Sequence, residues 1–129
     1  MQRVLVVIAA LVFGALTVFP TQAQELVESY RAFLSERDHF NSNGQRLTSA
    51  AAIIRQDRAN FHRFGIRDPN DESDAFFADT DNRASLERML ERGHSTPGTI
   101  SRIVNGTTLI RVDIYRTAAG PFVTVNILD

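Results

Sequence analysis

One carboxylate in the segment 49–64 is placed where apolar side chains gather. Drawn as a helix with about 100° per residue, the segment puts Asp57 within the arc of its apolar residues, so we expect this side chain to face the core. Burying an unpaired carboxylate is prohibitive, so Asp57 must be paired, hydrogen-bonded, protonated or directed into a cavity. We interpret it as a structural buried polar residue. Its candidate partners are Arg37, Arg46, Arg83, Asn82 and the amides of the loop 41–43.

Three basic side chains are expected on the opposite side of the same helix. Arg55, Arg58 and His62 fall within about 60° of one another, and three donors on one stripe could bind a phosphate or carboxylate. A solvated helix face looks the same in a sequence. One hypothesis is therefore a small-anion binder that uses these three residues, with His39 and Asn41 of the neighbouring polar loop as further candidate binding residues.

A hydrolase site is the catalytic alternative. It would combine His39, Asp57 and His62 beside the polar loop; a Ser-His-Asp triad could separately be drawn from Ser42, His39 and Asp57. A Ser-His-Asp hydrolase also needs an oxyanion hole, and the sequence has no Gly-x-Ser-x-Gly elbow. We therefore assign no catalytic residue and favour a protein without catalytic activity.

The sequence predicts neither a metal site nor a cofactor. Its three histidines, His39, His62 and His94, lack the i, i+4 spacing of a helical zinc pair, and no cysteine is present to supply a thiolate. The segment beginning at His39 resembles the spacing of a calcium loop, but the first and twelfth ligand positions carry His39 and Ala50 instead of acidic residues.

The N-terminus has the layout of a Sec-type secretory signal. Arg3 precedes the apolar run 4–19, and small residues lead up to Ala23. The run is shorter than the ~20 residues that span a bilayer. We expect residues 1–23 to be cleaved after Ala23, a periplasmic or secreted protein, and no membrane span after cleavage.

Composition limits the partners of the remaining chain. The 129 residues carry a formal net charge of −1, which becomes −2 without Arg3, and this balance argues against nucleic acid and anionic membrane surfaces. The absence of cysteine excludes disulfides. Residues 24–129 suit one small domain, and the partners we expect are another envelope protein or a small anionic ligand.

The first part of this domain shows a helical period. The apolar residues of 25–37 recur at three- and four-residue spacing, and those of 49–64 do the same. A polar break at 38–44 separates the two. We expect helices over 25–37, 49–64 and from Thr80 or Asp81 to 92, with a short turn carrying Phe76 and Phe77.

After residue 98 the sequence is typical of strands. Asn105-Gly106 favours a two-residue hairpin turn, and the loop 117–120 predicts a second hairpin. Its register places Ile110, Val112 and Ile114 opposite Ile127, Val125 and Val123, which gathers the aliphatic residues on one face. The predicted fold is α+β: N-terminal helices (two long, one or two short) packed on a C-terminal three-stranded antiparallel β-meander.

These patterns favour a small exported, non-catalytic protein that acts as an envelope binding or adaptor module. No catalytic constellation is coherent, whereas one sheet face is expected to be polar and to carry arginine. The small-anion binder and the hydrolase remain the alternatives.

Overall fold

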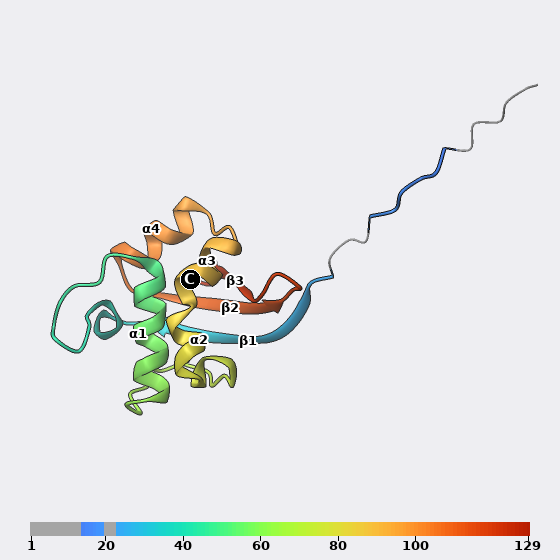
Figure 1. Cartoon of the computed structure of the whole chain (residues 1–129). Helices are drawn as coiled ribbons and strands as arrows, with labels where there is room; N and C mark the ends of the chain where they lie inside the picture. The colour runs from blue at the N-terminus through green and yellow to red at the C-terminus, as the bar shows by residue number, and fades with distance from the viewer. Residues whose placement is uncertain (1–13, 20–22) are drawn as a thin grey trace, which may run out of the picture.

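The protein folds as a three-stranded antiparallel sheet with its helices packed against it (Figure 1). The computed structural model describes residues 14–19 and 23–129; most of the predicted leader, 1–13 and 20–22, lies outside the described residues. Two 3-10 turns, η1 (Glu36–His39) and η2 (Phe76–Ala78), accompany the regular elements. These are β1 (Glu25–Leu34), α1 (Ala50–His62), α2 (Thr80–Ala84), α3 (Leu86–Arg92), α4 (Pro97–Asn105), β2 (Thr108–Arg116) and β3 (Phe122–Ile127).

The helix predicted over 25–37 is wrong, because this segment is the strand β1 followed by η1. Tyr30, Ala32 and Leu34 are buried at alternate positions, as a half-buried strand requires. An irregularity in the register between Leu26 and Glu28 shifts the alternation near the start of the strand. Pairing with β2 along its whole length therefore overrides a local pattern that suits a helix.

The hairpin between β2 and β3 is confirmed in its register. Ile110, Val112 and Ile114 lie opposite Ile127, Val125 and Val123, and Tyr115 lies opposite Phe122. All six aliphatic residues are buried or partly buried in the core. The alternation of aliphatic and polar residues predicts this register correctly because one face of the two strands packs against the core.

The third strand of the predicted meander is an N-terminal strand, not a C-terminal one. β2 pairs with β1 on one side and with β3 on the other, so the sheet order is β1-β2-β3. The predicted Asn105-Gly106 turn is wrong, since residues 97–105 form α4. Thr96 caps this helix by accepting a hydrogen bond from the Thr99 amide, and Pro97 occupies its first turn, where a missing N–H costs nothing.

The remaining helices follow the expected positions closely. α1 is confirmed, with the Ser49 hydroxyl accepting from the Ala52 amide as its N-cap. The helix expected from 80 to 92 is interrupted at Ser85, and Asp79 caps it instead of Thr80 or Asp81. No helix in the described ranges is both long and apolar enough to cross a bilayer.

The core lies between the aliphatic face of the sheet and α1, α3 and α4. The end of α3 and the strand β3 are in close contact at Gly93, where an added β-carbon would lie 1.7 Å from the carbonyl oxygen of Val123. α3 therefore ends directly against the backbone of β3, and only glycine fits there.

Candidate functional site

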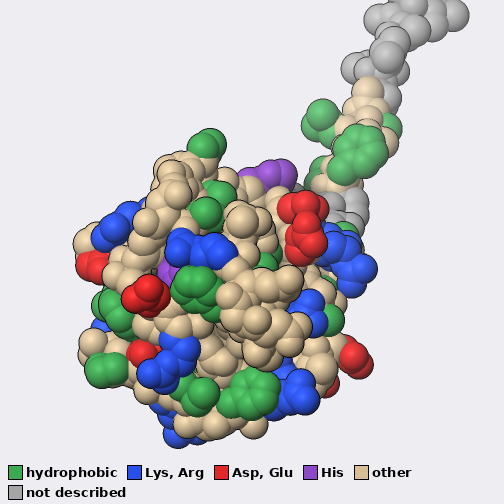
Figure 2. Space-filling model, turned by 90° about the vertical axis from the view of Figure 1, so that its left-hand side faces the viewer, with side chains coloured by type: hydrophobic (Ala, Val, Ile, Leu, Met, Phe, Trp, Pro, Cys, Tyr) green, Lys and Arg blue, Asp and Glu red, His purple; other side chains and the backbone are tan. Residues whose placement is uncertain are grey.

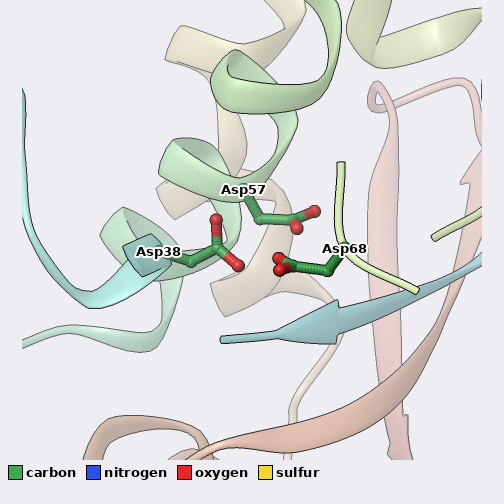
Figure 3. A group of neighbouring side chains, drawn as sticks. All are labelled: Asp38, Asp57 and Asp68. Carbon is green, nitrogen blue, oxygen red and sulfur yellow. The ribbon is translucent and has the colours of Figure 1, made fainter. Parts of the chain in front are cut away.

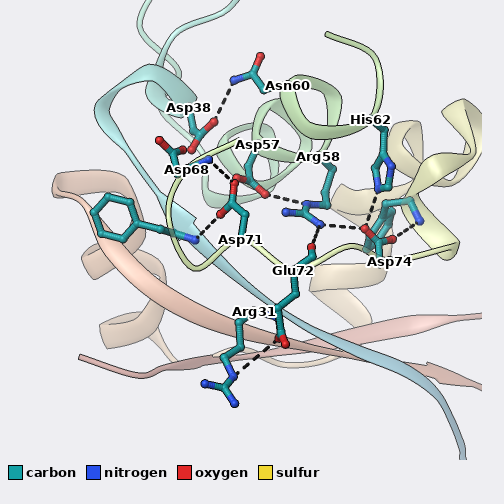
Figure 4. Close-up of polar contacts among 12 residues, drawn as sticks. Arg31, Asp38, Asp57, Arg58, Asn60, His62, Asp68, Asp71, Glu72 and Asp74 are labelled. Atoms are coloured by element: carbon teal, nitrogen blue, oxygen red, sulfur yellow. Dashed lines mark hydrogen bonds and ion pairs between the residues drawn. The ribbon is translucent and has the colours of Figure 1, made fainter. Parts of the chain in front are cut away.

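A buried arginine is the centre of a polar network under α1 (Figure 4). Arg58 is 0 % exposed, and its Nε donates to Asp57 at 2.7 Å while Nη1 donates to Asp74 at 2.9 Å and to the Glu72 carbonyl at 2.9 Å. Its guanidinium carbon lies 4.2 Å from the ring centroid of Tyr30. The predicted outer position of Arg58 is therefore wrong: β1 and the loop 67–75 cover this side of the helix.

Asp57 is buried in the core, at 1 % exposed, but its partner is none of the predicted ones. The residue that pairs with it is its neighbour Arg58. Burial raises the pKa of Asp57 well above its usual value, and the Arg58 charge counteracts this only in part because Asp38 and Asp71 lie close enough to oppose it.

The structure does not bring the three side chains of the hydrolase alternative together. Both ring nitrogens of His39 contact backbone carbonyl oxygens, those of Ser35 at 2.7 Å and Ile103 at 2.8 Å. His62 contacts Asp74 through Nε2 at 2.7 Å, and Asp57 pairs with Arg58. Each of these three side chains is already bonded to another group of the described fold.

Three carboxylates meet beside this network (Figure 3). One oxygen from each of Asp38, Asp57 and Asp68 lies within 4.8 Å of the others, an arrangement that could hold an oxygen-preferring cation. However, Ser35 and Asn60 already donate to the two oxygens of Asp38, and the Arg58 guanidinium lies against Asp57. We therefore interpret the trio as part of the buried hydrogen-bonded network and not as a metal site. Burial raises the pKa of Asp38 as well.

A surface hollow lies between α1 and the loop 40–47. It consists of two adjoining spaces of about 380 and 320 Å³. Both are lined by Asn41, Ser42, Gln56 and Phe64. The wall includes exposed apolar surface, since Phe64 is 47 % exposed. Hence the hollow combines aromatic, amide and hydroxyl groups on one surface.

Three arginines line this hollow without a carboxylate partner. Arg37 lines one space, and Arg55 and Arg63 line the other. Among residues 14–19 and 23–129, none of these guanidinium groups forms a hydrogen bond or an ion pair within 4.0 Å. The face carrying α1 and the loop shows arginine side chains next to apolar ones (Figure 2). The hollow is therefore positively charged and open to a partner.

The polar side chains of the hollow differ in how many of their hydrogen-bonding groups are already used within the protein. The Asn41 side chain is used within its own turn, where it accepts from the Asn43 and Gln45 amides and donates to Gln45. Gln56 donates to Asn60 at 2.9 Å, and Asn60 donates in turn to Asp38 at 2.9 Å. This chain fixes the Gln56 amide at the wall of the hollow.

Of the residues proposed from sequence, Arg55 and Asn41 line this hollow, whereas Arg58, His62 and His39 do not. Arg37 and Arg63 were missed. Arg63 is the C-cap residue of α1 and follows Arg55 by eight residues, which places the two about 80° apart around the helix axis. This spacing can be read from the sequence. The sequence does not place Arg37 at the hollow, because its position depends on η1, whereas the apolar period predicts a helix over 25–37.

Comparisons with known proteins give this chain no relative: no family model, no curated protein and no solved structure matches it.

Proposed function

We propose that this protein is an exported, non-catalytic binding module whose ligand is an anion held in the hollow between α1 and the loop 40–47. The observation that carries the proposal is the set of three guanidinium groups, Arg37, Arg55 and Arg63, that have no acceptor in the described part of the chain. Guanidinium groups bind carboxylates and phosphates through paired hydrogen bonds.

The wall of the hollow narrows the ligand class. Phe40 and Phe64 line the hollow, each with a guanidinium group over its ring, that of Arg46 at 5.5 Å and that of Arg63 at 5.1 Å from the centroid. Ser42 and Gln56 offer groups that bind hydroxyls. A sugar acid or a sugar phosphate presents both an anionic group and hydroxyls on a partly apolar ring. It therefore complements this wall better than an inorganic anion does.

Export is supported by the sequence layout and by the start of the fold. β1 begins at Glu25, directly after the predicted cleavage site at Ala23. The apolar side chains of Leu16, Val18 and Phe19 are exposed and do not join the core. N-terminal sequencing of the protein from a periplasmic fraction should give Gln24 as the first residue; an intact leader on cytosolic protein would contradict export.

Calorimetric titration tests the binding function. We expect phosphates, sugar acids or acidic peptidoglycan fragments to bind with an affinity that falls as salt rises, because the contacts are ionic. Arg55→Gln and Arg63→Gln should each weaken binding by about tenfold, the loss of one charged hydrogen-bonded contact.

Arg116→Gln is the matched control, since Arg116 is exposed at the end of β2 and lies outside the hollow. No binding of any anion, or equal loss in the Arg116 variant, would refute the assignment. Turnover of a hydrolase substrate that is abolished by Asp57→Asn or His62→Ala would favour the catalytic alternative.

A further inference from the structure

A second hollow, of about 530 Å³, lies where the start of α1 meets α3 and the start of α4. Its lining shares no residue with the arginine-lined hollow. The floor is apolar, because Ala50, Ala51 and Leu90 are buried there and Ile100 packs against the core. This size suits a small organic ligand.

The wall contributed by α3 is acidic. Glu87 and Glu91 are four residues apart, so they project from the same side of the helix. In the described residues neither carboxylate forms an ion pair or a side-chain hydrogen bond. The arginines of α3 are directed elsewhere: Arg88 donates to Ser85 at 3.2 Å, and Arg92 donates to the Pro121 carbonyl at 3.4 Å.

Two polar residues close the hollow after α3. His94 adopts a left-handed backbone with φ of 53°, a conformation that glycine adopts most easily. The glycine of this turn stands one position earlier, at Gly93, where contact with β3 requires it. A side chain is thus kept at the rim at the expense of backbone strain. The neighbouring Ser95 also lines the hollow, and its hydroxyl oxygen is buried with no partner among the described residues.

We propose that this hollow binds an organic cation, with its ammonium group between Glu87 and Glu91 and its hydrocarbon part on the apolar floor. The negative charge of the groups that line this hollow disfavours an anionic ligand. The first turns of α1 and α4 contribute about half a positive charge each, and the two carboxylates together with the C-terminal end of α3 outweigh them. The ligand class is therefore a primary amine with a short hydrocarbon body.

Titration of the whole protein with three probes of equal length tests the charge preference. The probes are n-hexylammonium, 1-hexanol and hexanoate, followed by NMR shifts of the Leu90, Glu91 and Ser95 amides. We expect n-hexylammonium to bind at millimolar concentration or below, 1-hexanol about tenfold more weakly, and hexanoate not at all. Equal affinity for the ammonium and the alcohol, or no response to the ammonium, overturns the proposal.

Exposed-residue variants test the site without endangering the fold. Glu87→Gln and Glu91→Gln should each weaken n-hexylammonium binding by about fivefold, whereas Glu25→Gln, an exposed glutamate at the start of β1, should leave it unchanged. An unchanged affinity in both α3 variants overturns the proposal.

The His94→Gly variant tests whether the His94 side chain contributes to ligand binding or affects only the stability of the fold. The variant relieves the left-handed strain, so its Tm should rise, while its affinity for n-hexylammonium should fall severalfold. A higher Tm with unchanged affinity would contradict a contribution of the His94 side chain, at the rim, to ligand binding.

Discussion

Asp57 and Arg58 are neighbours in sequence, and their side chains form a 2.7 Å ion pair inside the core. Consecutive residues on a helix point about 100° apart, so one might expect only one of the two to be buried. Both are buried because α1 is covered on two sides, by the sheet and by the loop 67–75. The single guanidinium also serves Asp74, which leaves the buried carboxyls in excess over the cation.

Removing Arg58 should strongly destabilise the fold. Arg58→Met keeps much of the volume but leaves Asp57 and Asp74 without their cation, and we expect the free energy of unfolding to fall by about 3–5 kcal/mol. Arg55→Met on the exposed face of the same helix should change it by less than about 0.5 kcal/mol. Urea unfolding of both variants measures this; similar small losses would contradict the account of the network.

The pH dependence of stability should reveal the raised pKa of Asp57. Its pKa is raised in the folded state above the ordinary value of 3.8, so the folded state binds the proton more tightly than the unfolded chain does. This contribution is complete below about pH 4 and is lost as the pH rises through the folded-state pKa.

Unfolding curves of the wild type and Asp57→Asn between pH 4 and pH 8 test this. The wild type should lose stability relative to the variant as the pH rises, because the amide cannot ionise. A difference between the two proteins that stays constant over the whole range would show that Asp57 is ionised throughout.

Alanine substitution at Gly93 tests how closely α3 packs on β3, and the same substitution at Gly98 is its control. A methyl group at Gly93 meets the Val123 carbonyl, so Gly93→Ala should destabilise by about 3 kcal/mol. Nothing lies within 4 Å of the corresponding position at Gly98, and Gly98→Ala in α4 should stabilise by about 0.5–1 kcal/mol. Thermal unfolding gives both values; the same sign for the two variants would contradict the close approach.

The loop 67–75 should protect the free edge of β1. Asp71 accepts hydrogen bonds from the Phe33 amide on β1 and from the Asp68 amide, both at 2.8 Å. Asp71→Ala leaves these donors without an acceptor, and we expect a loss of about 1–3 kcal/mol together with aggregation through the opened strand edge. Light scattering and urea unfolding check both effects. Asp81→Ala, with an exposed carboxylate, is the control, and an equal loss there would contradict the assigned role.

The sequence predicts those parts of the fold whose pattern is repeated locally. The alternation of Ile110, Val112 and Ile114 predicts the register with β3, and the apolar period of 49–64 predicts α1. β1 was missed because Ala32, one of its three buried core positions, gives a weak apolar signal, while neighbouring residues happen to repeat at helical spacing. Pairing with β2, some eighty residues away, decides its conformation.

In the buried polar network, too, the sequence predicts what depends on local pattern and misses what depends on distant segments. Asp57 could be placed in the core from α1 alone, because the helix wheel is a local property. Arg58 could not, since the loop that buries it follows in sequence and leaves no periodic signal. Long-range cover, rather than residue type, separates the buried Arg58 from the exposed Arg55.

The most direct test of the central claim is an NMR titration of the protein with glucuronate, a sugar acid. The account predicts saturable shifts of the amides around the hollow, those of Asn41, Ser42, Gln56 and Arg63, which disappear in an Arg55→Gln, Arg63→Gln double variant and persist in Arg116→Gln. Shifts confined to other surfaces, or shifts unaffected by the double variant, would contradict it.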